Sequence, residues 1–223
     1  MDRPAAVRTW ALVGLAAQVV FVAAWLLAGL WQGAGYSALR HTISDMYAVG
    51  APYGLFLVVT LTLCGLGTVL FALRGLCPAL RGSGRVGTVG CVLLACSILG
   101  LGDLLSPFER EGCRLADPGC SPAGQLANAG GKLDALLSTV GLVLLVVAGF
   151  LLASAMRRVP AWRGVSRPTR WVTALVVLLL LATLLVPDLG GLTERLLALG
   201  AAAAVGALAV AVRRRPPATG TTS

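Results

Sequence analysis

The chain has 223 residues, of which 57% are hydrophobic and 12% are charged. Soluble domains are about 45–50% apolar and about 25% charged, so this composition excludes an ordinary soluble domain and indicates a membrane protein. A net charge of +9 would suggest nucleic acid in a soluble protein. We expect no nucleic-acid partner here, because most of the basic residues lie in short segments that flank apolar runs.

Six apolar runs are long enough to cross a bilayer, which takes about 20 helical residues. The expected spans are residues 10–30, 53–73, 86–105, 133–156, 171–186 and 196–212. They predict an all-α fold, a polytopic transmembrane bundle of six helices. We expect a single integral-membrane domain over residues 1–223, with residues 213–223 as a disordered cytoplasmic tail.

Charges of opposite sign lie on opposite sides of these runs. Thirteen of the 18 basic residues fall on one side: Arg3, Arg8, Arg74, Arg81, Arg85, Arg157, Arg158, Arg163, Arg167, Arg170, Arg213, Arg214 and Arg215. Eight of the nine acidic residues fall on the other: Asp45, Asp103, Glu109, Glu111, Asp117, Asp134, Asp188 and Glu194. The positive-inside rule makes the arginine-rich side, with both termini, cytoplasmic. A single lysine with abundant alanine and glycine fits a GC-rich bacterial genome, so we expect a bacterial plasma membrane.

The segment after the first span has an amphipathic pattern. Apolar residues at 36, 39, 43 and 46 share one helical face, and polar residues at 37, 40, 41, 44 and 45 share the other. This spacing predicts a short amphipathic outer helix in which Arg40 with Ser44, and His41 with Asp45, are i, i+4 pairs. Such a helix either lies on the membrane surface or forms the wall of a pocket.

Three carboxylates stand at or near the ends of spans. Asp103 ends the third span, where an ionisable group is costly and usually partnered. Asp134 begins the fourth span and Glu194 the sixth, so both either stabilise a helix start or face a pocket. We expect most other charges between Asp103 and Asp134 to be solvated.

The cysteines differ between the two sides. Cys113 and Cys120 fall in the loop between the third and fourth spans, seven residues apart with Pro118 and Gly119 between them. An oxidising exterior favours a disulfide between this pair. The remaining cysteines lie within spans or on the cytoplasmic side, and the chain has no C-x-x-C pair that would suggest a redox enzyme.

Residues 37–45, Ser-Ala-Leu-Arg-His-Thr-Ile-Ser-Asp, follow a Gly-Tyr pair and a first span. With six spans, a polar end to the third span at Asp103 and Glu194-Arg195 opening the sixth, the chain resembles the bacterial integral-membrane family catalogued as domain of unknown function number 998. Many members carry histidine near the start of the fourth span, where this chain has Lys132 and Asp134. That departure weakens the case for a shared metal site. The resemblance implies a fold and topology but no activity.

Three classes of function remain open. The first is binding of a lipid headgroup or small molecule in an outer polar pocket formed by Arg40, His41, Ser44, Asp45, Asp103, Asp134, Glu194 and Arg195. The second is a structural or accessory membrane protein, and the third is a membrane-embedded enzyme that uses the outer carboxylates. A single histidine and the lack of catalytic motif spacings argue against the enzyme, and we expect no cofactor and no metal.

Two further expectations concern mechanism. The span centres carry almost no ionisable residues, which favours binding near the surface over full translocation. The cost of an unpaired carboxylate at Asp103 predicts that Arg40 or His41 approaches Asp103 or Glu194 within salt-bridge reach. Oligomeric state cannot be inferred from these patterns.

Overall fold

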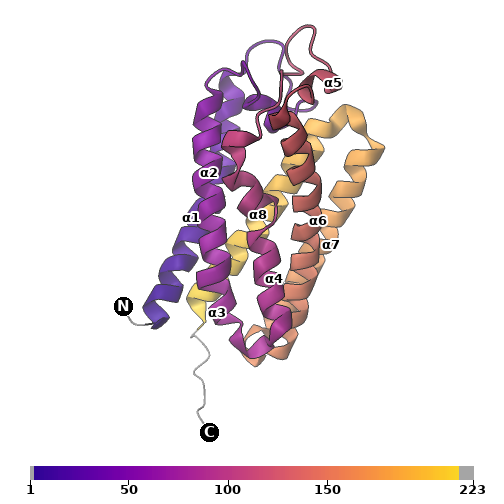
Figure 1. The fold of residues 1–223 in the computed structure, drawn as a ribbon. Coiled ribbons are helices and arrows are strands. Elements are labelled where there is room, and N and C mark those ends of the chain that lie inside the picture. Colours follow the sequence, from indigo (N-terminus) through magenta and orange to yellow (C-terminus); the bar gives the residue numbers. More distant parts are fainter. Residues whose placement is uncertain (1–2, 216–223) are drawn as a thin grey trace.

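The computed structural model describes residues 3–215, and these residues form helices and turns without a strand. Six helices are long and apolar enough to cross a membrane. They lie side by side in one bundle, and α1 begins at the end of the bundle where α8 finishes (Figure 1). The predicted all-α, six-span fold is therefore confirmed.

The helices have the following bounds. The long elements are α1 (Arg3–Ala28), α2 (Gly54–Leu70), α4 (Arg85–Ala95), α6 (Ala129–Arg158), α7 (Arg163–Leu185) and α8 (Gly190–Arg214). A π-helical segment (Phe71–Leu76) and α3 (Cys77–Ala79) extend α2, a second π-helical segment (Ile98–Gly102) follows α4, and α5 (Pro122–Gln125) lies in a loop. Short 3₁₀ segments cover Gly29–Trp31, Ser44–Met46, Arg81–Ser83, Ser106–Phe108, Pro160–Trp162 and Pro187–Leu189. Helix α8 extends to Arg214, so the first two residues of the predicted disordered tail are helical, and its residues 216–223 lie outside the described residues.

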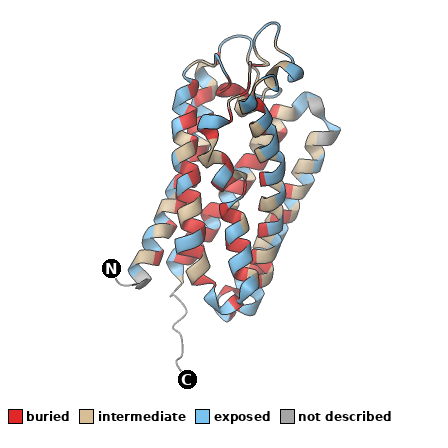
Figure 2. Ribbon diagram, in the orientation of Figure 1, coloured by how far each residue is buried: buried red, intermediate tan, exposed pale blue. Residues whose placement is uncertain are grey.

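The six spans form a closed ring. Helix α1 packs against α2 and α8, α8 against α7, α7 against α6, and α6 against α4. The ring closes where α2 packs against the third span, at α4 and the π-helical segment Ile98–Gly102. Buried residues face the inside of this ring (Figure 2). Association within a bilayer depends on close packing and not on hydrophobic transfer, and small residues allow it. On α8, Ala201 and Ala202 are each 2% exposed, which fits that role.

The third span is discontinuous, which sequence analysis missed. Helix α4 ends before Ser97, whose backbone is extended, and the chain resumes as the π-helical segment. The carbonyl oxygen of Ser97 accepts hydrogen bonds from the backbone N–H groups of Gly100 and Gly102. A side chain at Gly141 of α6 would overlap the backbone of Ile98, so that glycine is needed for the break to pack closely. Irregular backbone at membrane depth occurs where it is buried or lines a cavity.

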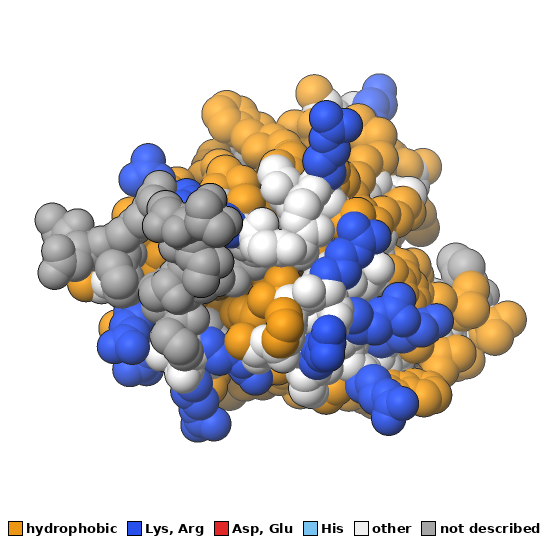
Figure 3. Space-filling model, turned by 90° about the horizontal axis from the view of Figure 1, so that it is seen from below, with side chains coloured by type: hydrophobic (Ala, Val, Ile, Leu, Met, Phe, Trp, Pro, Cys, Tyr) orange, Lys and Arg blue, Asp and Glu red, His pale blue; other side chains and the backbone are white. Residues whose placement is uncertain are grey.

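The two ends of the bundle differ in charge. At the end where α1 begins, basic side chains project from the surface and no acidic side chain is visible on the described part of that face (Figure 3). We call this the basic end. The opposite end, here called the acidic end, carries segment 32–53, the loop of residues 103–128 and the turn between α7 and α8 (Figure 1).

The short amphipathic outer helix is not formed, so that prediction was wrong. Between Tyr36 and Tyr47 the only helical residues are the 3₁₀ turn Ser44–Met46. The segment instead folds into turns that pack against α8. The backbone N–H of Leu192 donates to the carbonyl oxygen of Leu39, and a side chain at Gly191 would overlap the backbone of residues 38 and 41. Tertiary contacts to a helix start distant in sequence override the local helical period.

Candidate functional site

A cavity of about 410 Å³ lies at the acidic end, inside the ring of helices. This volume is within the range of small-molecule sites, about 300–1,000 Å³. Every span contributes to its lining. The polar lining residues are Thr42, Ser44, Tyr47, Asp103, Glu111, Asp134, Ser138, Thr183 and Glu194, and the apolar ones include Phe21, Leu61, Ile98, Leu99, Leu142, Leu180, Leu197, Ala198 and Ala201. We call it the acidic cavity, because four carboxylates line it and its described lining includes no basic side chain.

Asp134 is held by a tyrosine. The hydroxyl of Tyr47 donates to its Oδ1 at 3.2 Å, and both side chains are buried. Burial, followed by the nearby Asp134 carboxylate, raises the pKa of Tyr47 well above its usual value, so the hydroxyl remains a donor at neutral pH. The helix-start interpretation of Asp134 was wrong, because Asn128 caps α6 by accepting from the N–H of Gly131.

Glu111 reaches the cavity from the loop. Its Oε1 accepts from the hydroxyl of Ser44 at 3.1 Å, and its Oε2 accepts from the side-chain amide of Gln125 at 2.7 Å. Burial and the nearby Asp134 carboxylate raise the pKa of Glu111 to about 8. Glu111 is buried and not solvated, so the expectation for most charges of this loop fails here.

Glu109 and Arg114 of the same loop are also buried. Glu109 is 2% exposed, and its Oε1 has no hydrogen-bond partner among the described residues. Burial, then repulsion from Asp134 and Asp103, raises the pKa of Glu109 to about 8. The loop is therefore an ordered acidic cover over the bundle.

Glu194 and Asp103 complete the acidic lining. The carboxylate of Glu194 accepts the backbone N–H of Ile43, at 3.3 Å to Oε1 and 3.2 Å to Oε2. This contact joins α8 to the turn after the first span, so Glu194 does not cap its own helix. Asp103 follows the broken third span and lines the cavity beside Ile98 and Leu99.

The basic residues of this end do not neutralise these carboxylates. Within residues 3–215 the only ion pair joins Arg114 to Asp117, at 3.2 Å. The prediction that Arg40 or His41 lies within salt-bridge reach of Asp103 or Glu194 was therefore wrong. Arg40 is exposed, and Nδ1 of His41 accepts from the backbone N–H of Ser37 at 2.9 Å.

The guanidinium groups of this end donate hydrogen bonds to backbone carbonyl oxygens instead. Arg195 donates to the carbonyl oxygens of Ala38, His41 and Gly191 at 2.7–2.9 Å, and to the hydroxyl of Tyr36. In the same way, Arg110 donates to the carbonyl oxygens of residues 47 and 48. Arg114 donates to that of residue 32. These bonds fix the turns of the acidic end and leave the cavity acidic.

Asp45 also has an anchoring role. It is fully buried, and its carboxylate accepts the backbone N–H groups of Leu115 and Ala116. It does not line the cavity. The predicted i, i+4 pairing of His41 with Asp45 is therefore not formed, and Asp45 holds the loop of residues 103–128 down on the bundle.

Of the eight predicted site residues, the cavity unites Ser44, Asp103, Asp134 and Glu194 and leaves out Arg40, His41, Asp45 and Arg195. The predicted site omitted five polar residues that line the cavity: Thr42, Tyr47, Glu111, Ser138 and Thr183. Tyr47 could have been predicted, because it lies two residues after the motif of residues 37–45. Glu111 could not, because nothing in the loop sequence distinguishes it from its neighbours. Among residues 3–215, no three His, Cys, Asp or Glu side chains are placed to hold a metal ion. The carboxylates lie on several walls, an arrangement suited to accepting hydrogen bonds from a bound group.

The two cysteines of the loop of residues 103–128 lie close together. The Sγ atoms of Cys113 and Cys120 are at disulfide distance, and their Cα atoms are 6.0 Å apart. A cross-link there would close the turn of residues 117–119 next to the amides that Asp45 binds.

Comparison with known proteins gives one match. The model of the family described as "Protein of unknown function (DUF998)" matches residues 15–211. That range includes all the residues that line the acidic cavity. No curated protein and no solved structure matches the chain.

Proposed function

Given that this chain belongs to the DUF998 family, whose description assigns no activity, we propose that the protein binds a small molecule or lipid headgroup in the acidic cavity. The observation that supports this most is the lining itself, four carboxylates without a basic side chain around about 410 Å³. A ligand that donates hydrogen bonds or carries positive charge fits it best, and a primary amine does both.

The energetics favour such a ligand over an anion. Burial without a cation disfavours the ionised form of an acid, which is why the pKa of Glu111 is raised to about 8, and a bound ammonium group would favour the ionised form again. An ammonium group that enters the cavity restores attraction in a medium where charges interact strongly. A phosphate or carboxylate there would meet like charges, which raises its free energy. We therefore propose an amine-bearing ligand.

Thermal unfolding of the purified protein with octylamine tests the proposal. A ligand that binds only the folded state raises stability in proportion to the logarithm of its concentration above Kd. We expect saturable stabilisation by octylamine and none by octanol or octanoate at matched concentration. Asp134→Asn and Glu194→Gln should each weaken binding about tenfold, equivalent to about 1.4 kcal/mol. Asp188→Asn is the control, because Asp188 is an exposed acid at the same end and does not line the cavity.

The results separate the proposed classes of function. Equal stabilisation by octanoate, or equal loss in Asp188→Asn, would show that the cavity carboxylates do not select a cation. Absence of stabilisation by octylamine would refute amine binding and leave the structural role as the better account.

We also infer that the basic end faces the cytoplasm of a bacterial plasma membrane. The arginine residues that flank the spans collect at that end, and anionic headgroups of the cytoplasmic leaflet attract them. The acidic cavity then opens toward the exterior, on the same side as Cys113 and Cys120, where a disulfide is favoured.

A further inference from the structure

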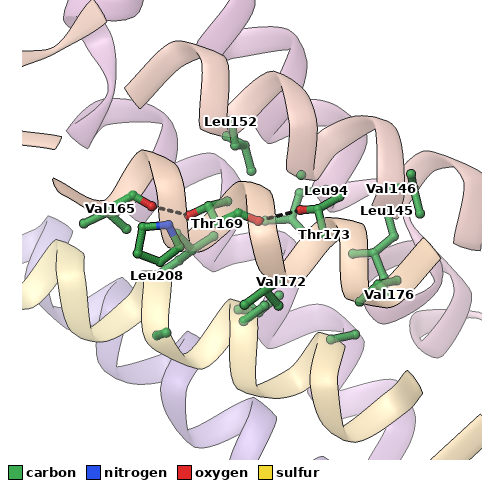
Figure 4. A pocket seen from close by; sticks show the side chains of 16 residues that line it. Leu94, Leu145, Val146, Leu152, Val165, Thr169, Val172, Thr173, Val176 and Leu208 are labelled. Atoms are coloured by element: carbon green, nitrogen blue, oxygen red, sulfur yellow. Dashed lines mark hydrogen bonds between the residues drawn. The ribbon is translucent and has the colours of Figure 1, made fainter. Parts of the chain in front are cut away.

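A second cavity lies below the acidic cavity, in the half of the bundle next to the basic end. It holds about 110 Å³ between α4, α6, α7 and α8. Leu94, Leu145, Val176 and Leu208 are among its lining side chains, which are almost all apolar (Figure 4). We call it the lower cavity.

The two threonine hydroxyls on its wall are already engaged. Thr169 donates to the carbonyl oxygen of Val165 at 2.9 Å, and Thr173 donates to that of Thr169 at 2.8 Å (Figure 4). Both bonds lie within α7, so the wall offers no unused hydroxyl proton. The lower cavity therefore suits hydrocarbon, in contrast to the carboxylate-lined cavity above it.

The two cavities follow one another along a single seam between α6, α7 and α8. Ala201 of α8 lines both of them. On α7, Leu180 lines the acidic cavity, and Val176, one helical turn below, lines the lower one. On α6, Leu142 lines the acidic cavity, and Leu145, about one helical turn below, lines the lower one.

The seam is long enough to hold a lipid chain over the full depth of one leaflet. Its ends on α8 are Glu194 and Leu208, which lie about 21 Å apart at 1.5 Å per residue. Half of a hydrocarbon core about 30 Å thick is about 15 Å, so the seam is longer than one leaflet is deep. Ala201 and Ala204, with short side chains, leave room along it.

We propose that the ligand is a single-chain amphiphile whose amine head lies in the acidic cavity and whose hydrocarbon chain follows the α6–α7–α8 seam into the lower cavity. This rests on the proposed function, and it adds the chemical class of the ligand. Charge complementarity selects the head. The lower cavity, at about 110 Å³, selects one chain over the pair of chains of a phospholipid.

Photolabelling in phosphatidylcholine nanodiscs tests this placement with two probes. Both are long-chain primary alkylamines, one with a diazirine at the end of the chain and the other with a diazirine beside the amine. We expect the chain-end probe to label residues 165–176 and 204–208, and the head probe to label residues 42–47 and 190–198. Excess unlabelled amine should displace both probes.

Substitutions that fill the lower cavity provide the second measurement. Ala204→Phe, and independently Ala207→Phe, should lower chain-end labelling along the seam about tenfold, equivalent to about 1.4 kcal/mol. Head labelling should persist in both variants. Ala203→Phe is the matched control, because Ala203 is exposed and lines neither cavity.

The outcomes distinguish the two proposals. If neither probe is displaced by unlabelled amine, the proposed function itself fails. If the head probe labels the acidic cavity but chain-end labels spread over lipid-facing residues such as Leu63, or persist at the seam in both filled variants, amine binding stands and the chain placement is overturned.

Discussion

Replacing Asp45 should destabilise the protein strongly, although the substitution removes no side chain that lines the cavity. The side chain is 0% exposed, and its carboxylate accepts two backbone N–H groups from residues 115 and 116. Hydrogen bonds to a charged group contribute about 1.5–3 kcal/mol each, and the second contact, at 3.4 Å, is long. We therefore expect Asp45→Ala to lower the free energy of unfolding by about 3–5 kcal/mol.

Asp45→Asn should have an intermediate effect. Its amide oxygen can accept one of the two N–H groups, but its NH₂ group cannot accept the other, so we expect a loss of about 1.5–3 kcal/mol. Asp117→Ala is the control, because Asp117 belongs to the same loop and is exposed. Its partner Arg114 is buried but keeps its hydrogen bonds to Gln32 when Asp117 is removed, so the loss should stay well below that of Asp45→Ala.

Unfolding by sodium dodecyl sulfate in mixed micelles measures these differences, and amide hydrogen exchange reports on the loop. In Asp45→Ala the amides of Leu115 and Ala116 should lose protection, while those at the centres of α6 and α8 exchange as in the wild type. A loss below about 1 kcal/mol, or unchanged exchange at these two amides, would refute the anchoring role.

Three other predictions follow from the charges and thiols of the acidic end. Because the pKa of Glu109 is raised from 4.5 to about 8 in the folded protein, the unfolded state releases this proton first, and stability should fall as pH rises from about 4.5 to about 8. Glu109→Gln should flatten that slope in unfolding measurements at pH 5 and pH 8, and an unchanged slope would contradict it. A non-reducing digest should yield a peptide linking Cys113 to Cys120, whereas recovery of both as alkylated free thiols would exclude the disulfide. Single cysteines placed between Arg157 and Arg170 should react in intact cells with membrane-permeant but not impermeant reagents, and labelling from outside would reverse the proposed orientation.

Hydropathy and charge were sufficient to predict the spans and to place the acids at one end. Asp103, Asp134 and Glu194 were recognised because each terminates or begins an apolar run, and helix ends at one face of a bundle must lie near one another. Ser44 was found through the motif of residues 37–45. In these cases a one-dimensional pattern determines a position in space, because a span has a fixed length and direction.

The remaining features depend on contacts between segments distant in sequence. Asp45 and Arg195 were assigned to the pocket for their charge, but their partners are backbone groups, which carry no residue-specific signal. The break at Ser97 was missed because residues 91–102 are apolar except for Ser97 itself, and only the nearby Gly100 and Gly102 indicate irregular backbone. Glu111 became a cavity residue through the fold of its loop, which hydropathy does not specify.

The hydrogen bonds of the arginines at the acidic end help to explain why the cavity is acidic. A protein that needed its carboxylates only for stability could have paired them with Arg110 or Arg195, which lie at the same end. Both donate instead to backbone carbonyl oxygens, and the cavity carboxylates receive neutral donors from Tyr47, Ser44 and the backbone of residue 43. Neutral donors hold an acid in position without the salt bridge that would neutralise it, so its ionised form remains able to pair with an entering cation. The energetic cost of that arrangement is lowered when a cationic group enters, and this is the physical reason for proposing an amine as the ligand.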